Sequence, residues 1–165
     1  MANRNTFWTE ADGVIRFSVT SDGTTGSKWI ARLRAKDWTP LEEDRKVILS
    51  INPTNGVTYH VAVLKGCNLK LVERRTQNIH AEANLRKLLK PSVEVDCLIR
   101  DAFSFCEIRS MGLHWIFAMH DHSPIMPMSE CDLVGDRWLL AYIPDRDIWD
   151  VPLIGFAFIE SQVNK

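Results

Sequence analysis

The chain has 165 residues, of which 45% are hydrophobic and 25% are charged. This length fits a single domain, whose core is large enough to need neither a disulfide nor a structural metal. The formal net charge of −1 excludes a domain that coats nucleic acid by bulk charge. No apolar run approaches the ~18 residues of a membrane span. We therefore expect one soluble domain over residues 1–165, with no membrane contact.

The N-terminus and the cysteines indicate a cytoplasmic protein. Residues 1–8 lack the apolar stretch of a secretory signal. The four cysteines, which include no C-x-x-C pair, are Cys67, Cys97, Cys106 and Cys131. We expect all four to be reduced, with Cys97 as a small buried thiol within a helix.

The first fifty residues predict one strand and two helices. Residues 14–20 alternate between apolar and polar side chains, as in a half-buried strand. A turn over residues 21–26 follows, and Ser27 is placed to cap a short helix that carries Trp29, Ile30 and Leu33 inward. The segment from Thr39 to Glu42 then has the spacing of a capping box, with proline at the first helical position. This second helix should run to about Ser50.

The middle of the chain predicts a strand and three helices. Residues 57–64 are rich in β-branched side chains and form the second expected strand. Residues 76–90 have a helical pattern, and residues 93–102 place Val95, Leu98, Ile99 and Ala102 on one helix face. A second capping box, from Ser104 to Glu107, opens a short helix that Gly112 closes.

The last third of the chain predicts β structure. Residues 113–120, 137–143 and 153–160 are short aromatic and branched runs separated by proline-containing loops. Together the elements predict an α+β domain, with a mostly antiparallel sheet of about five strands and the middle helices packed on one face.

Several segments resemble a group of uncharacterised bacterial proteins. They include Ser21-Asp22-Gly23-Thr24-Thr25-Gly26 followed by Trp29-Ile30, together with residues 53–66, 111–120 and 154–158. These pieces occur in the same order and cover about half of the chain. Genes of this group travel in the mobile cassettes of bacterial integrons. The resemblance thus implies a bacterial, mobile-element origin, and it carries neither an activity nor catalytic residues.

The turn after the first strand is a candidate anion site. A glycine-containing turn that opens a helix presents free backbone N–H groups, and hydroxyls and a charge could be added by Thr24, Thr25, Ser27 and Lys28. The two residues between the glycines are too few for a P-loop. The alternative is an ordinary tight turn, which Asp22 caps, with glycines at positive φ.

Three histidines form a candidate metal site. His114, His120 and His122 could share one face of a continuous strand, with His60 or Asp121 as a further ligand. The alternative is that His120 and His122 lie in the loop that ends the strand. We expect no cofactor, and a divalent metal is the alternative.

The charges and tryptophans suggest interaction surfaces. Residues 65–90 carry a net charge of +5, and residues 121–160 carry −6. The basic segment could bind nucleic acid, with the helices between Ser92 and Gly112 as a helix-turn-helix. It lacks aromatic side chains for base stacking, which argues against this. The two segments could also pair within or between subunits, or remain solvated. Trp38 and Trp149, if exposed, would anchor a protein interface.

No complete catalytic motif is present, which favours a protein that is not an enzyme. The leading hypothesis is a small cytoplasmic, non-catalytic binding or accessory protein that forms a homodimer and takes a protein partner or a small ligand. One alternative is a metal-dependent enzyme that uses His120 and His122. Another is a nucleic-acid-binding protein that uses residues 70–90.

Overall fold

The computed structural model describes residues 7–36, 40, 42–121, 130–131, 137–138, 149 and 153–161. Its elements in chain order are β1 (Thr9–Ala11), β2 (Val14–Asp22), α1 (Gly26–Arg34), α2 (Glu42–Leu49), β3 (Asn55–Lys65), the short 3-10 helices η1 (Gly66–Asn68) and η2 (Leu71–Glu73), α3 (Thr76–Leu85), β4 (Leu88–Leu89), α4 (Val93–Ala102), α5 (Phe105–Ser110), β5 (Trp115–Ala118), β6 (Glu130–Cys131), β7 (Arg137–Trp138) and β8 (Ile154–Glu160).

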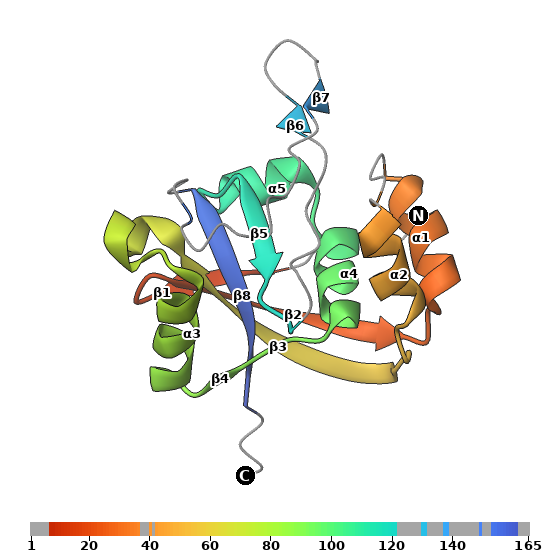
Figure 1. Cartoon of the computed structure of the whole chain (residues 1–165), viewed down its shortest axis with the longest axis horizontal. Coiled ribbons are helices and arrows are strands. Elements are labelled where there is room, and N and C mark those ends of the chain that lie inside the picture. Colours follow the sequence, from red (N-terminus) through yellow and green to blue (C-terminus); the bar gives the residue numbers. More distant parts are fainter. Residues whose placement is uncertain are drawn as a thin grey trace.

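The main sheet has six strands and confirms the α+β class (Figure 1). Its order is β1-β2-β3-β8-β4, with β5 also paired to β8. All neighbouring strands are antiparallel except β5 and β8, which run parallel. The strands β2 and β3 form the longest ladder, in which Ile15 lies opposite Val63 and Ser18 lies opposite His60. The predicted strands at residues 14–20, 57–64 and 153–160 are therefore confirmed.

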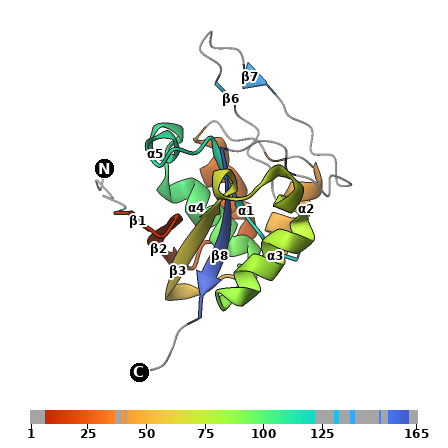
Figure 2. The ribbon, with the colours of Figure 1, turned by 90° about the vertical axis from the view of Figure 1, so that its left-hand side faces the viewer.

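Helices cover the two faces of this sheet unequally. One face packs against α1, α2 and α4 through Trp29, Leu33, Ile48, Val95 and Ile99. The other face packs against α3 through Ile79 and Ala83. Figure 2 shows α3 and α4 on opposite sides of β3 and β8. The sequence analysis predicted that the middle helices pack on one face of the sheet. Helix α3 packs on the other face instead, because Val14, Ala62 and Leu64 make that face apolar too.

Several local predictions are confirmed at the level of single residues. Trp29, Ile30 and Leu33 are buried along α1. The Ser104 hydroxyl accepts a hydrogen bond from the Glu107 amide, and the Glu107 carboxylate accepts one from the Ser104 amide. Hydrogen bonds from the Ser104 hydroxyl and from the Ser104 amide to the Glu107 carboxylate lower the pKa of Glu107 below its usual range. The second predicted capping box is therefore present in the structure, at the start of α5.

Two helix boundaries differ from the predictions. The first helix begins at Gly26 with Thr25 as its N-cap, so Ser27 is not the cap. The helix predicted over residues 76–90 ends at Leu85, and Lys87 takes a left-handed φ of 57°. Leu88 and Leu89 then pair with β8 as β4, because this places Leu88 in the apolar cluster under α3.

Other predictions lie partly outside the described residues. Thr39 is among these, so the first capping box is not described, and α2 begins at Glu42, two positions after the first helical residue that the sequence predicts, Pro40. The strand predicted over residues 137–143 is described only at Arg137–Trp138. The strand predicted over residues 113–120 is confirmed for Trp115–Ala118.

The described cysteines agree with a reduced state. Cys67 and Cys106 are free and exposed, and Cys97 is free and buried in α4. Burial raises the pKa of the Cys97 thiol. Among the described helices, none has the length and apolar character that crossing a membrane requires.

Candidate functional site

A groove lined by polar and apolar side chains runs along β2 and extends to side chains of β3 and β8. It has a volume of about 660 Å³. Strand β1 pairs only with the start of β2, from Val14 to Arg16. Over the described part of the chain, no strand pairs with the outer edge of the segment Phe17–Asp22, which we call the free edge. The groove is lined by this free edge, by Phe7, Thr9, Arg16, His60 and Glu160, and by Leu98 and Ala102 of α4.

Three polar pairs lie along this groove: two join the neighbouring strands β2 and β3, and the third joins β2 to β8 across β3. The Ser18 hydroxyl lies 2.9 Å from Nδ1 of His60. The hydroxyls of Thr20 and Thr58 are 2.9 Å apart, and Nε of Arg16 donates to Oε1 of Glu160 over 2.7 Å. Apart from Thr58, their members also line the groove. The sequence analysis did not identify these pairs.

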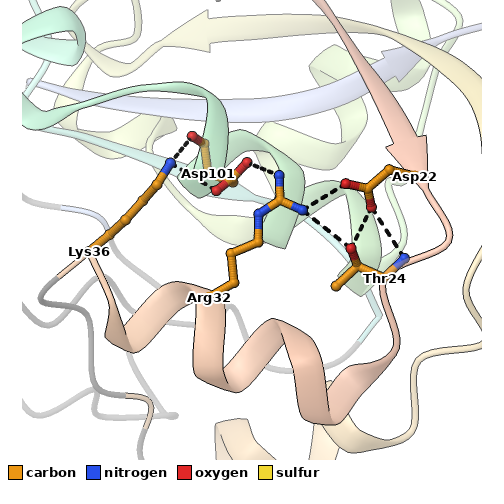
Figure 3. A network of polar contacts seen from close by, with 5 residues as sticks. All are labelled: Asp22, Thr24, Arg32, Lys36 and Asp101. Atoms are coloured by element: carbon orange, nitrogen blue, oxygen red, sulfur yellow. Dashed lines mark hydrogen bonds and ion pairs between the residues drawn. The ribbon is translucent and has the colours of Figure 1, made fainter. Parts of the chain in front are cut away.

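The far end of the groove is fixed by a network of ion pairs centred on Arg32 (Figure 3). Asp22 at the end of β2 accepts hydrogen bonds from the amide of Thr24 over 3.2 Å and from its hydroxyl over 2.5 Å. The Arg32 guanidinium on α1 donates to Asp22 over 2.7 Å and also bonds Asp101 on α4. Lys36 reaches Asp101 as well, over 2.8 Å. The network therefore ties β2, α1 and α4 together at one point.

The electrostatics of this network favour ionised carboxylates. The hydrogen bond from the Thr24 hydroxyl outweighs the effect of burial and, with Arg32, lowers the pKa of Asp22 to about 2. Burial opposes ionisation of Asp101, but hydrogen bonds from Arg32 and Lys36 lower its pKa overall. Both carboxylates thus stay charged at neutral pH and hold Arg32 between them.

Replacing Asp22 with asparagine should remove a pH-dependent part of the stability. The folded-state pKa of about 2 lies below the ordinary aspartate pKa of 3.8, so this contribution is present above pH 3.8 and is lost as the pH falls towards 2. Asp22 is 38% exposed, and solvent screening limits the expected loss at neutral pH to about 1 kcal/mol. Urea unfolding at neutral pH and at about pH 2 should show the difference from wild type shrinking in acid.

The exposed Asp12 provides the control for this experiment, since Asp12→Asn changes a carboxylate in the β1–β2 turn at a φ that asparagine also tolerates. It should leave the pH dependence of stability as in wild type. If Asp22→Asn behaved like Asp12→Asn, the network would not stabilise the fold.

The four residues of the predicted anion site lie close together, but a carboxylate of the protein is already present among them. Thr24 is bonded to Asp22, and the hydroxyls of Thr25 and Ser27 are 3.4 Å apart. Lys28 is exposed on α1. Gly23 takes a positive φ of 75°, as the tight-turn alternative requires. Anion binding at Thr24, Thr25, Ser27 and Lys28 stays a prediction, and the geometry favours the tight turn.

The predicted metal ligands do not come together where the structure describes them. His120 is buried, with its Nε2 3.7 Å from a carboxylate oxygen of Asp96 on α4. The His114 ring packs edge-on against Trp115, and His60 lies in the groove beside Ser18. Asp121 forms an ion pair with Lys90, and His122 is outside the described residues. Within the described ranges there is no group of three metal-ligating side chains.

Two acidic residues on α4, missed by the sequence analysis, are buried near His120. Glu94 accepts hydrogen bonds from the amide of Thr54 over 2.9 Å and from its hydroxyl over 2.7 Å. Asp96 forms an ion pair with Arg100 over 3.1 Å. Glu94 and His120 also line a second cavity, with a volume of about 310 Å³. The bonds of Glu94 join α4 to Thr54, just before β3, while the Asp96–Arg100 ion pair lies within α4.

The predicted interaction surfaces are described only in part. Trp149 is half-buried and packs against Phe117 and Phe156, and its ring N–H donates to the Thr76 hydroxyl over 3.1 Å. Trp38 lies outside the described residues. In the suggested helix-turn-helix, residues 93–99 of α4 are all buried, which leaves these turns no face for a DNA groove. Interface roles for Trp38 and Trp149 and nucleic-acid binding by residues 70–90 stay predictions.

In comparisons with known proteins, no protein-family model, curated protein or solved structure matches the chain.

Proposed function

We propose that this chain is a small cytoplasmic, non-catalytic binding or accessory protein that acts as a homo-oligomer, with the groove along β2 as its contact surface. The observation that carries the proposal is the free edge, Phe17–Asp22. Its outward backbone groups can pair with another extended segment, and such strand addition is a common mode of protein recognition.

The chemistry of the groove supports binding rather than catalysis. Ser18 and His60 have the spacing of a nucleophile and a base, but an activated pair also needs a third group that orients the base. Among the described residues no carboxylate bonds the His60 ring, and Glu160 is held by Arg16. The polar side chains of the groove thus bond to each other, as in a surface that is organised before a partner arrives.

Light scattering coupled to size exclusion tests the oligomeric part of this proposal. We expect a mass of twice the 18.9 kDa of one chain, with the dimer fraction rising between about 5 and 300 µM protein. A mass of 18.9 kDa throughout that range would contradict the proposal.

A further inference from the structure

We infer that the partner at the free edge is the same strand of a second copy, paired antiparallel about a two-fold axis, so that the two main sheets become continuous. This inference rests on the proposed homo-oligomeric function and specifies its interface. A two-fold contact uses the same surface on both copies, so that surface must complement itself.

Between Phe17 and Ser21, the free edge lacks most of the usual protection against strand pairing. Natural edge strands carry lysine, proline, inward-pointing charges or bulges that keep other strands away. The segment Phe17–Ser21 has no charged residue, no proline and no glycine, and it is rich in residues that favour strands. The bulge in the β2–β3 ladder lies between Thr20 and Asp22, at the end of this segment. At the rim of the same groove, the side chain of Phe7 is 82% exposed.

The charges at the two ends of the segment complement each other. Arg16 precedes the free edge, and Asp22 ends it. In an antiparallel pair of identical strands, the Arg16 end of each copy lies beside the Asp22 end of the other, which gives two symmetric attractions. Arg16 uses Nε for Glu160, and a guanidinium has five N–H donors, so further donors can face Asp22 of the second copy.

The alternation of side chains and the place of β1 restrict the register to one choice. Residues opposite each other in an antiparallel pair point to the same face, so the two-fold axis must pass beside a residue. An axis beside Val19 or nearer to Arg16 would place the second copy where Thr9 already pairs with Arg16, and an axis beside Ser21 would pair only Thr20 to Asp22. The axis therefore passes beside Thr20, with Ser18 of each copy opposite Asp22 of the other. In this register Ser18 and Thr20 of the two copies lie in one polar row, while Phe17 and Val19 stay on the face that α1, α2 and α4 cover.

A lysine on the free edge should separate the copies. Thr20→Lys places two like charges across the two-fold axis. We expect it to weaken dimerisation at least tenfold, because like charges on directly opposed residues repel each other and lysines on edge strands prevent pairing in natural sheets. The control is Thr58→Lys on β3. It points to the same face and removes the same Thr20–Thr58 hydrogen bond, but it leaves the free edge unchanged. Circular dichroism should show both variants folded.

Cysteine cross-linking tests the register, in a background where Cys67, Cys106 and Cys131 are replaced by serine. Cβ atoms of directly opposed residues come within about 4.5–5.5 Å, close enough for a disulfide with small adjustment. An axis beside Thr20 predicts a cross-linked dimer from Thr20→Cys alone. Ser18→Cys is the control, because Ser18 lies opposite Asp22 of the second copy in this register and should not cross-link.

The outcomes separate this inference from the function on which it rests. A dimer that forms equally well with Thr20→Lys and Thr58→Lys, or that Thr20→Cys does not cross-link, would overturn pairing through β2 and leave the homo-oligomer standing. A chain that stays monomeric at every concentration would overturn both.

Discussion

Replacing Asp96 with alanine is expected to lower the free energy of unfolding by about 3–5 kcal/mol, because it breaks a buried ion pair from one side. The Asp96 side chain is 1% exposed and lies 3.1 Å from Nε of Arg100 and 3.7 Å from Nε2 of His120. Without the carboxylate, the guanidinium of Arg100 would remain almost buried and would lose this ion pair. Chemical denaturation followed by circular dichroism measures the loss.

The matched control is Glu82→Ala on α3. Glu82 and Arg86 have the same spacing, and their ion pair of 2.6 Å is partly exposed, with 32% and 42% of the two side chains accessible. Removing Glu82 should cost at most about 0.5 kcal/mol. A double variant, Asp96→Leu with Arg100→Leu, should be more stable than Asp96→Ala, because both charged groups are then replaced by apolar side chains of similar size. If Asp96→Ala cost no more than Glu82→Ala, burial of the pair would not stabilise the fold.

The sequence predicts the elements of the fold best where local chemistry decides the structure. The alternation along residues 14–20 and the capping box at Ser104 each specify an element through neighbours in the chain. Leu88 and Leu89 show the opposite case. Their spacing continues the helical pattern of α3, but pairing with Ile159 and Glu160, some seventy positions later, makes them a strand. Such long-range pairing cannot be read from a single segment.

The candidate site was harder to predict because it depends on the register of the sheet. Ser18 and His60 are 42 positions apart, and each occupies an unremarkable outward position of its own strand. Only the pairing of β2 with β3 brings them together. The burial of Asp96 was hidden for a related reason, since an acidic residue in the first turn of a helix usually faces solvent. Here the whole start of α4 is enclosed.

Replacing Gly26 with alanine is expected to destabilise the protein by about 2–3 kcal/mol, although alanine is the better helix former by about 1 kcal/mol. Gly26 is the first residue of α1, and its backbone lies against α2. A Cβ atom there would come within 2.2 Å of the carbonyl oxygen of Ile48 and 2.7 Å of Cα of Leu49. Because both are backbone atoms, the two helices must move apart. Thermal and chemical unfolding should both show the loss.

The neighbouring variant Ser27→Ala provides the control. Ser27 is exposed and is not the N-cap, so its loss should change stability by less than about 0.5 kcal/mol, whereas removal of a capping serine typically costs about 1 kcal/mol. Displacing α1 should also affect the groove, because Arg32 on this helix holds Asp22 at the end of β2. We therefore expect Gly26→Ala, but not Ser27→Ala, to weaken self-association. Equal stability of Gly26→Ala and wild type would contradict the close approach of α1 and α2.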